Sequence, residues 1–310
     1  RVFPISDKAS DVAEALEAEL ERLKVTVIPK RVKQITRDPF MMITPKNSYG
    51  PFDKVIIATG GKSYPHTGST GDGYKLAAPH NIITPRPVLV PIETEELYCR
   101  DLMGLTLKNV KLSVEQNIEN NKKTVFEDLG ELVFTHFGVS GPLVLSASVH
   151  INPDYPAKLY IDLKPGLTDE KLDERILEDF SSYKNKDFCN SLSKLLPKRL
   201  IHTTVRLSRI PHNKKVNEIT KEERHQFRDL LKKFPMTFQN FRPIDEAIIT
   251  AGGIDLKEIN PQTMESKLIP GLHFAGEVVD LAAYTGGFNL QIAFSTAFAA
   301  SFGCVTCRGR

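Results

Sequence analysis

The chain has 310 residues, more than one hydrophobic core usually serves, so we expect two or three domains. Hydrophobic residues make up 41% and charged residues 25%, which is ordinary for a globular protein and excludes global disorder. The 41 lysines and arginines against 38 acidic residues leave a net charge of +3, too small to argue for a nucleic-acid or membrane partner.

The N-terminal part predicts one helix followed by short strands. A helical pattern opens at residues 6–7 and places four apolar residues on one face: Val12, Leu16, Leu20 and Leu23. The stretch 25–28 predicts a strand, and two more are expected around 32–36 and 41–44. At 53–61 a continuous apolar run stops at small residues, as in a strand buried on both faces.

The middle of the chain changes character twice. From 85 to about 163, short strands alternate with turns and prolines, which indicates an antiparallel β unit. Helices follow: one capped by Thr168, one over 188–200, and one opened by the capping box at 220–223. Strands return from residue 244, and an apolar helix over 292–302 completes the chain.

Cysteine usage and hydropathy predict a cytoplasmic protein without a membrane span. The four cysteines are scattered in a large chain, as reduced thiols are. Cys304 and Cys307 form a lone C-x-x-C without the second pair that a zinc site needs, so we predict no metal site. The first residues show no signal-peptide pattern, and we expect no apolar run near the roughly 20 residues of a membrane helix.

Two strand ends are candidates for ligand contact. Ala58, Thr59 and Gly60 end the apolar run of 53–61, and small residues at a strand's carboxyl end let a ligand approach the backbone. A plain strand-to-turn connection has the same pattern. Gly276, with Glu277 and later Asp280, ends another predicted strand. Those carboxylates could accept hydrogen bonds from sugar hydroxyls or could cap the next helix.

A third candidate lies at the head of the last helix, and its residues are Gly286, Gly287, Phe288, Asn289 and Leu290. Unpaired backbone N–H groups and the positive end of the helix dipole favour an electron-rich partner there. A glycine turn before a helix is the structural alternative. The three segments together favour a cofactor cleft more than any one of them does.

The order of several short motifs along the chain makes it similar to the BaiN family of bacterial flavoproteins. Members of this family are also described as NAD(P)/FAD-dependent or aminoacetone-oxidase-like oxidoreductases. The resemblance covers essentially the whole chain. The matching stretches are 1–6 (RVFPIS), 58–63 (ATGGKS), 67–74 (TGSTGDGY), 134–142 (FTHFGVSGP), 250–254 (TAGGI), 275–280 (AGEVVD) and 284–289 (YTGGFN).

The resemblance implies an α/β fold of three parts. A Rossmann-like FAD/NAD(P)-binding domain, expected at 1–84 and 245–310, is interrupted by a β-barrel-like domain at 85–164 and 233–244. That domain is itself interrupted by a small helical insert at 165–232. The family also opens with a strand, a G-x-G-x-x-G turn and a helix, and no such motif occurs here. We therefore expect an incomplete cofactor domain, truncated at its N-terminus, with exposed apolar edges and poor FAD binding by itself.

The resemblance also implies which residues contact the cofactor. Thr59, Gly60, Gly276, Glu277, Asp280, Gly287, Asn289 and Leu290 would lie along the flavin and ribityl chain of FAD, and Val32 near the adenine. The implied activity is that of an FAD-dependent oxidoreductase. NAD(P)H is the possible electron donor, and a small organic molecule or oxygen is the acceptor.

One histidine and one basic region leave alternatives open. His136 could transfer a proton because its pKa is normally near neutrality, or it could be a structural hydrogen-bonding residue. Basic residues cluster between 194 and 215, as a solvated helical surface or as an anion-binding face. A non-catalytic or RNA-associated module is the alternative function. We expect nucleic-acid binding to be unlikely because few aromatic residues accompany these charges.

Overall fold

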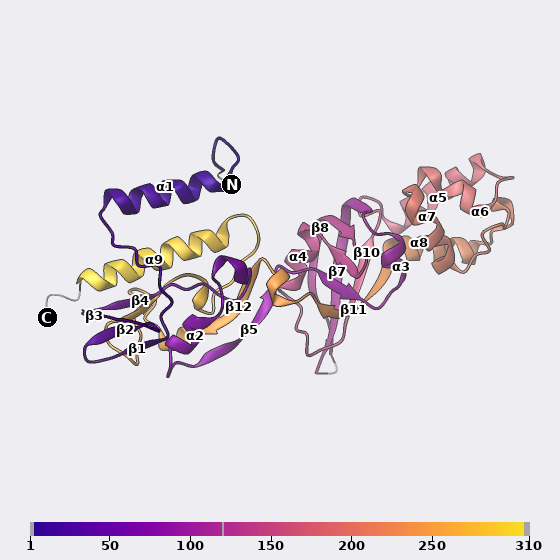
Figure 1. Ribbon diagram of the computed structural model, residues 1–310. Coiled ribbons are helices and arrows are strands. Elements are labelled where there is room, and N and C mark those ends of the chain that lie inside the picture. Colours follow the sequence, from indigo (N-terminus) through magenta and orange to yellow (C-terminus); the bar gives the residue numbers. More distant parts are fainter. Residues whose placement is uncertain (1–2, 120, 307–310) are drawn as a thin grey trace. The chain divides into compact units, whose positions relative to one another are not determined.

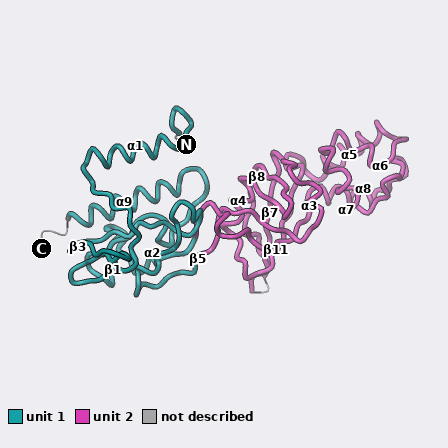
Figure 2. Tube along the Cα trace, viewed as in Figure 1, with its two compact units in different colours: residues 1–85, 251–310 teal, residues 86–250 magenta. Residues whose placement is uncertain are grey.

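The computed structural model describes residues 3–119 and 121–306 (Figure 1). Residues 1–2 of the first family motif, and Cys307, lie outside the described residues. The chain forms two compact units, one of residues 1–85 and 251–310 and one of residues 86–250 (Figure 2). The fold agrees with the expected class. The first unit mixes helices and strands, and the second unit, inserted between the two parts of the first, contains a closed barrel and helices.

The first unit is built around a parallel strand pair. Strand β4 (Val55–Ile57) pairs with β13 (Leu272–Phe274), and both are largely buried. The other elements are α1 (Ala9–Arg22), β1 (Gln34–Thr36), β2 (Phe40–Ile43), β3 (Ser48–Phe52), η1 (Pro65–Thr67), α2 (Asp72–Leu76), η5 (Leu256–Glu258), η6 (Gly276–Val278) and α9 (Phe288–Thr306). The antiparallel order β1-β2-β3 forms a separate small sheet. The chain passes between the units within β5 (Ile82–Val88) and β12 (Ile249–Ile254).

The N-terminal helix forms as expected, but its apolar face is not covered by any described residue. No residue of α1 is buried, and Val12, Leu16 and Leu20 remain 46%, 51% and 40% exposed. The strand expected at 25–28 was a wrong prediction, because these residues form no ladder. A β-branched stretch becomes a strand only where a neighbouring strand accepts its backbone hydrogen bonds.

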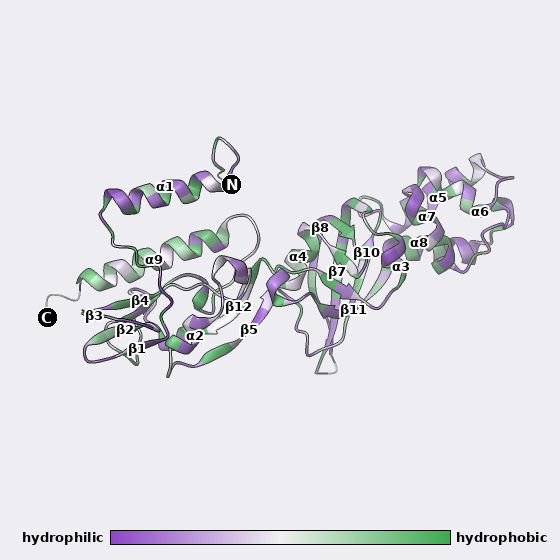
Figure 3. Cartoon of the chain, viewed as in Figure 1, coloured by the Kyte–Doolittle hydropathy of each residue, from purple (hydrophilic) through white to green (hydrophobic). Residues whose placement is uncertain are grey.

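Helix α9 corrects the expectation that no apolar run approaches a membrane span. Its 18-residue stretch Phe288–Val305 carries no charge, has a mean hydropathy of 1.3 and is 17% buried. By length and composition alone it could cross a membrane, and a single such helix is weak evidence for one. Its exposed aromatic residues Phe294, Phe298 and Phe302 follow one side of the helix because they are four residues apart. Figure 3 colours α9 mostly green and pale.

The second unit contains a closed six-stranded barrel with the order β10-β11-β6-β9-β8-β7. The strands are β6 (Ile92–Thr94), β7 (Thr106–Ile118), β8 (Asn121–Phe134), β9 (Gly138–Ser140), β10 (Ala157–Asp162) and β11 (Phe234–Phe241), with α3 (Tyr98–Asp101) and α4 (Pro142–Ser148) beside them. Along β7 buried Leu112 and Val114 alternate with more exposed residues, as a strand with one face on a core requires. Closure leaves few free strand edges.

The helices between β10 and β11 follow their local signals. They are α5 (Asp169–Ser182), α6 (Phe188–Ser191), η2 (Leu192–Lys194), α7 (Lys198–Ser208), η3 (Val216–Glu218) and α8 (Lys221–Lys232), and η4 (Ile244–Glu246) comes after β11. The side chain of Thr168 caps α5, and Thr220 with Glu223 forms a complete capping box at α8. The single helix expected over 188–200 is instead broken before Pro197, which is the N-cap of α7.

Candidate functional site

The parallel pair brings two of the three predicted segments together. Phe274 lies opposite Ile57, and the N–H of Ala275 donates to the carbonyl of Ile57 at 3.0 Å. Parallel strands end at the same edge of their sheet, so Ala58–Gly60 and Gly276–Glu277 emerge side by side although more than 200 residues separate them. This edge is where open α/β sheets bind ligands.

Glycine is required on both sides of this edge. Gly60 has φ +72° and Gly276 has φ +74°, values that other residues adopt only with strain. Glycine is also required at position 73, but there the reason is lack of space for a side chain. A methyl group at that position would lie 2.0 Å from Oγ1 of Thr59 and 3.0 Å from Cγ2 of Val278. Helix α2 therefore packs directly against both strand ends.

A cavity of about 700 Å³ opens along β4 at this edge. Three residues predicted from the sequence line it, namely Val32, Ala58 and Thr59. At its margin, Nε of Arg31 donates to Oδ2 of Asp72 at 2.6 Å. This hydrogen bond lowers the pKa of Asp72, so the carboxylate stays ionised at neutral pH. Residues 55–57 of β4 also line the cavity, and no residue of β13 does.

Tyr74 is a site residue that the sequence reasoning did not single out. Its hydroxyl is buried and has no hydrogen-bond partner among the described residues. Burial, followed by the nearby carboxylates of Glu277 and Asp280, raises the pKa of Tyr74 to about 12. A buried hydroxyl without a partner is costly, and a polar ligand would remove that cost. Its place in the glycine-rich stretch 67–74 was the available signal.

Asp280 has a defined structural contact. Its Oδ1 accepts a hydrogen bond from the N–H of Gly252 at 3.0 Å, and its own N–H donates to the carbonyl of Ile254. One carboxylate oxygen thus binds the backbone of β12 at Gly252. The second, Oδ2, makes no hydrogen bond to the described residues, and a carboxylate oxygen can accept more than one.

Helix α9 contacts the edge through Thr296, a residue outside the third predicted segment. The hydroxyl of Thr296 accepts a hydrogen bond from the N–H of Gly276 at 2.9 Å, and α9 packs on 276–278. The amide of Asn289 bonds to its own loop, accepting from the N–H of Ala283 and donating to its carbonyl, both at 2.9 Å. Asn289 therefore shapes this loop with its side chain.

The remaining residues of the third segment have free space around them or exposed side chains. Gly286 and Gly287 have φ +116° and +93°, and a methyl group at Gly287 would meet nothing within 4 Å. The side chains of Phe288 and Leu290 are 59% and 66% exposed. The head of α9 thus presents backbone N–H groups together with uncovered apolar side chains.

His136 belongs to the second unit and not to the unit that carries the strand edge. It is exposed next to β9, and its ring packs edge-on against Phe137 at 5.0 Å between centroids. Arg242 covers the same phenylalanine ring at 4.6 Å. Arg242, and to a smaller extent His136, lower the pKa of Glu246. The charged side chains near His136 are therefore Arg242 and Glu246, both in the second unit.

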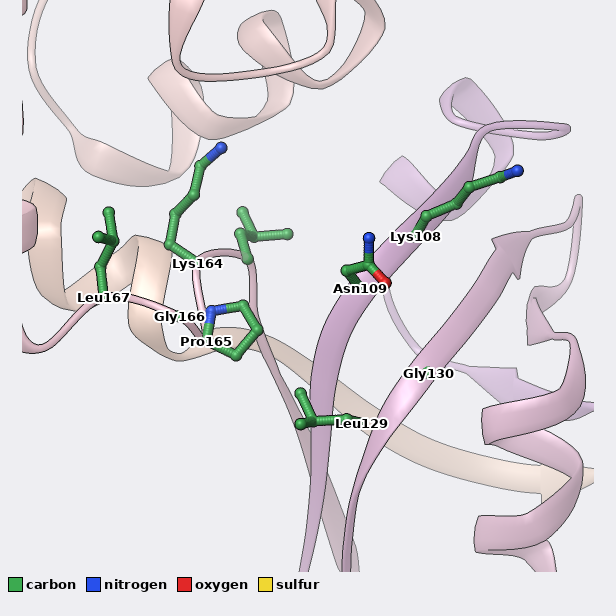
Figure 4. A pocket seen from close by; sticks show the side chains of 9 residues that line it. Lys108, Asn109, Leu129, Gly130, Lys164, Pro165, Gly166 and Leu167 are labelled. Carbon is green, nitrogen blue, oxygen red and sulfur yellow. The ribbon is translucent and has the colours of Figure 1, made fainter.

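A second cavity, of about 660 Å³, lies in the second unit between the barrel and the turn that precedes α5 (Figure 4). Lys164 stands on one wall, and Lys108 and Asn109 stand on the other. Burial, with a further contribution from Arg175, lowers the pKa of Lys164. None of the site residues predicted from the sequence lines this cavity.

The parallel pair with glycine-ended strands, together with a barrel inserted into the same chain, defines an α/β protein of the Rossmann-like class. The family model described as "HI0933-like protein Rossmann domain" matches residues 1–303. The chain belongs to this family of flavoprotein oxidoreductases, which confirms the resemblance to BaiN-type proteins.

Three curated relatives carry two kinds of name. The chain is 30% identical to the ribosomal RNA dihydrouridine synthase of Escherichia coli, over 94% of this chain and 71% of the relative. It is 28% identical to the 3-dehydro-bile acid delta(4,6)-reductase of Clostridium scindens, over 96% and 74%. The ribosomal RNA dihydrouridine synthase of Haemophilus influenzae is 29% identical, over 94% and 71%.

Proposed function

We propose that this protein is an FAD-dependent reductase that takes electrons from NAD(P)H and reduces a C=C bond conjugated to a carbonyl group. The observation that carries the proposal is the shared edge of β4 and β13, where Gly60, Gly276 and the buried Tyr74 hydroxyl lie together. When bound, FAD supplies the hydride-transferring group, which no side chain can provide.

The side chains at the edge suit the polar parts of a flavin nucleotide. The raised pKa of Tyr74 keeps its hydroxyl protonated at neutral pH, so it can donate one hydrogen bond to the ligand. Asp280, fixed on Gly252 through Oδ1, and Glu277 beside it would accept from ribityl hydroxyls. Ala58 and Gly60 present backbone without bulky side chains.

The cavity along β4 lies beside a strand that has one pairing partner, β13, among the described strands. Residues 55–57 of β4 line this cavity, and an exposed strand edge is stabilised when a further strand covers it. We propose that a strand with a G-x-G-x-x-G turn pairs here, because such a turn would place a pyrophosphate beside Ala58 and Thr59.

The names of the relatives guide the choice of acceptor. Dihydrouridine is uridine with its ring C=C bond reduced, and a 3-dehydro-delta(4,6) bile acid has C=C bonds conjugated to a ketone. In both cases one carbon gains a hydride and the other carbon gains a proton. We infer an acceptor of this class; the proton donor predicted from the sequence, His136, lies in the second unit.

The test uses the protein expressed from the whole open reading frame that contains this sequence. We expect bound flavin in the visible spectrum, bleaching with NADH or NADPH, and reoxidation by an α,β-unsaturated ketone. Tyr74→Phe and Glu277→Ala should each weaken FAD binding about tenfold, the effect of roughly one hydrogen bond. The control is Tyr155→Phe, which removes a hydroxyl from the other unit. A colourless protein that FAD does not reconstitute would refute the proposal.

A further inference from the structure

The exposed face of α7 carries only basic side chains. Every fully exposed position in the helix is Lys, Arg or His, and the residue that ends the helix, Arg209, is also basic and exposed. The exposed residues are Lys198, Arg199, His202 and Arg206. The opposite face is buried in the core of the second unit through Leu200, Ile201, Thr204 and Val205. The helix is thus fixed by one face and offers the other to solvent.

One of these bases has a structural role. The guanidinium of Arg199 donates to the carbonyls of Asp101 and Met103, at 3.2 and 2.8 Å. The other four, Lys198, His202, Arg206 and Arg209, make no side-chain hydrogen bond or ion pair within the described part of the chain. We call these four residues the basic stripe.

Several bases elsewhere between β10 and β11 form ion pairs, whereas the residues of the basic stripe form none within the described part of the chain. Examples are Lys214–Glu223, Lys215–Asp187, Arg224–Asp173 and Lys232–Asp162, at 2.6 to 2.8 Å. The segment 182–216 nevertheless holds nine lysines and arginines against one aspartate, a net charge of +8 in a chain of net +3. Its positive potential is therefore uncompensated along α7.

Two residues of the basic stripe occupy positions where their side chains reduce the stability of the fold. Lys198 opens α7, where the positive end of the helix dipole repels a cation, and the first turn contains no acidic residue. Arg209 ends the helix with φ +60°, a left-handed conformation that favours glycine. Folding alone would place other residue types at both positions.

One aromatic ring, that of Tyr183, lies beside two of the neighbouring bases. The ammonium groups of Lys186 and Lys194 lie 4.1 and 5.3 Å from the ring centre of Tyr183. Aromatic rings beside basic side chains are typical of surfaces that bind single-stranded nucleic acid. Between residues 182 and 216, none of the described large apolar side chains is strongly exposed, as a membrane-bound helix would require.

We propose that the basic stripe binds the phosphodiester backbone of RNA. Lys198 and Arg209 are 11 residues apart, or about 16 Å along a helix, which is longer than a single phosphate group. Arginine and lysine neutralise phosphates, and arginine does so with two parallel hydrogen bonds. This binding does not depend on the flavin, and it would supply the reductase with a nucleic-acid substrate.

The experiment measures binding of a fluorescein-labelled RNA hairpin to the full chain by fluorescence anisotropy, without flavin. We expect affinity to fall steeply with salt. In Lys198→Gln/Arg206→Gln the log–log salt slope should shrink by about 1.5, which weakens binding on the order of 30-fold at about 0.1 M salt. The matched control, Lys171→Gln/Lys221→Gln, removes the same charge from exposed positions of α5 and α8 and should bind like the parent.

Three outcomes would overturn the proposal: no RNA binding, equal losses in the two double variants, or binding of phosphatidylserine vesicles in place of RNA. Circular dichroism of both variants shows whether α7 remains folded. Since no flavin is present, a negative result leaves the reductase proposal untouched, and a colourless protein would leave RNA binding untouched.

Discussion

Gly73→Ala tests whether the two strand ends and α2 are packed as tightly as the structure indicates. The added methyl group would lie 2.0 Å from Oγ1 of Thr59, 3.2 Å from its Cβ and 3.0 Å from Cγ2 of Val278. Rotation of Thr59 can relieve the first contact but not the other two. Overpacking of this kind costs about 1–3 kcal/mol, so the melting temperature should fall by about 2–9 °C.

The assay is thermal unfolding followed by circular dichroism, with two companion variants. Thr59→Ala/Gly73→Ala should recover part of the loss, because the hydroxyl nearest the new methyl is gone. Gly166→Ala adds the same methyl group where nothing lies within 4 Å and should change stability little. If Gly73→Ala melts like the parent, α2 does not pack against the strand ends and the proposed site is wrong.

Three further predictions concern local contacts. Arg209→Gly should raise the free energy of unfolding by about 0.5–1 kcal/mol in denaturant titration, whereas Arg209→Gln, which keeps the strained φ, should not. Asp173→Asn should destabilise the protein at neutral pH. The hydrogen bond from Arg224 lowers the pKa of Asp173, so the stabilisation is complete above about pH 4, the ordinary pKa of an aspartate, and disappears as the pH falls through the lowered pKa. A stability difference that does not shrink as the solution is acidified would contradict this. Asn289→Ala should release the loop at Ala283 and speed amide exchange there, and unchanged exchange would argue against that role.

The sequence by itself determined the features that depend on neighbouring residues. The caps at Thr168 and at 220–223, the strand β4 and the antiparallel region of the barrel were predicted from local pattern, because cap chemistry and apolar alternation act within a few residues. Motif order indicated the family, which the family model confirms.

The tertiary structure decided what depends on distant partners. The same apolar periodicity predicts buried faces for α1 and α5, yet α1 buries none of its residues and α5 buries Leu172 and Ile176. Likewise, stretch 25–28 has strand composition but no ladder. The burial of Tyr74 and the pairing of β4 with a strand more than 200 residues away leave no mark in local pattern. Whether a residue is buried or paired depends on the segment that contacts it, and a local sequence pattern says nothing about that distant segment.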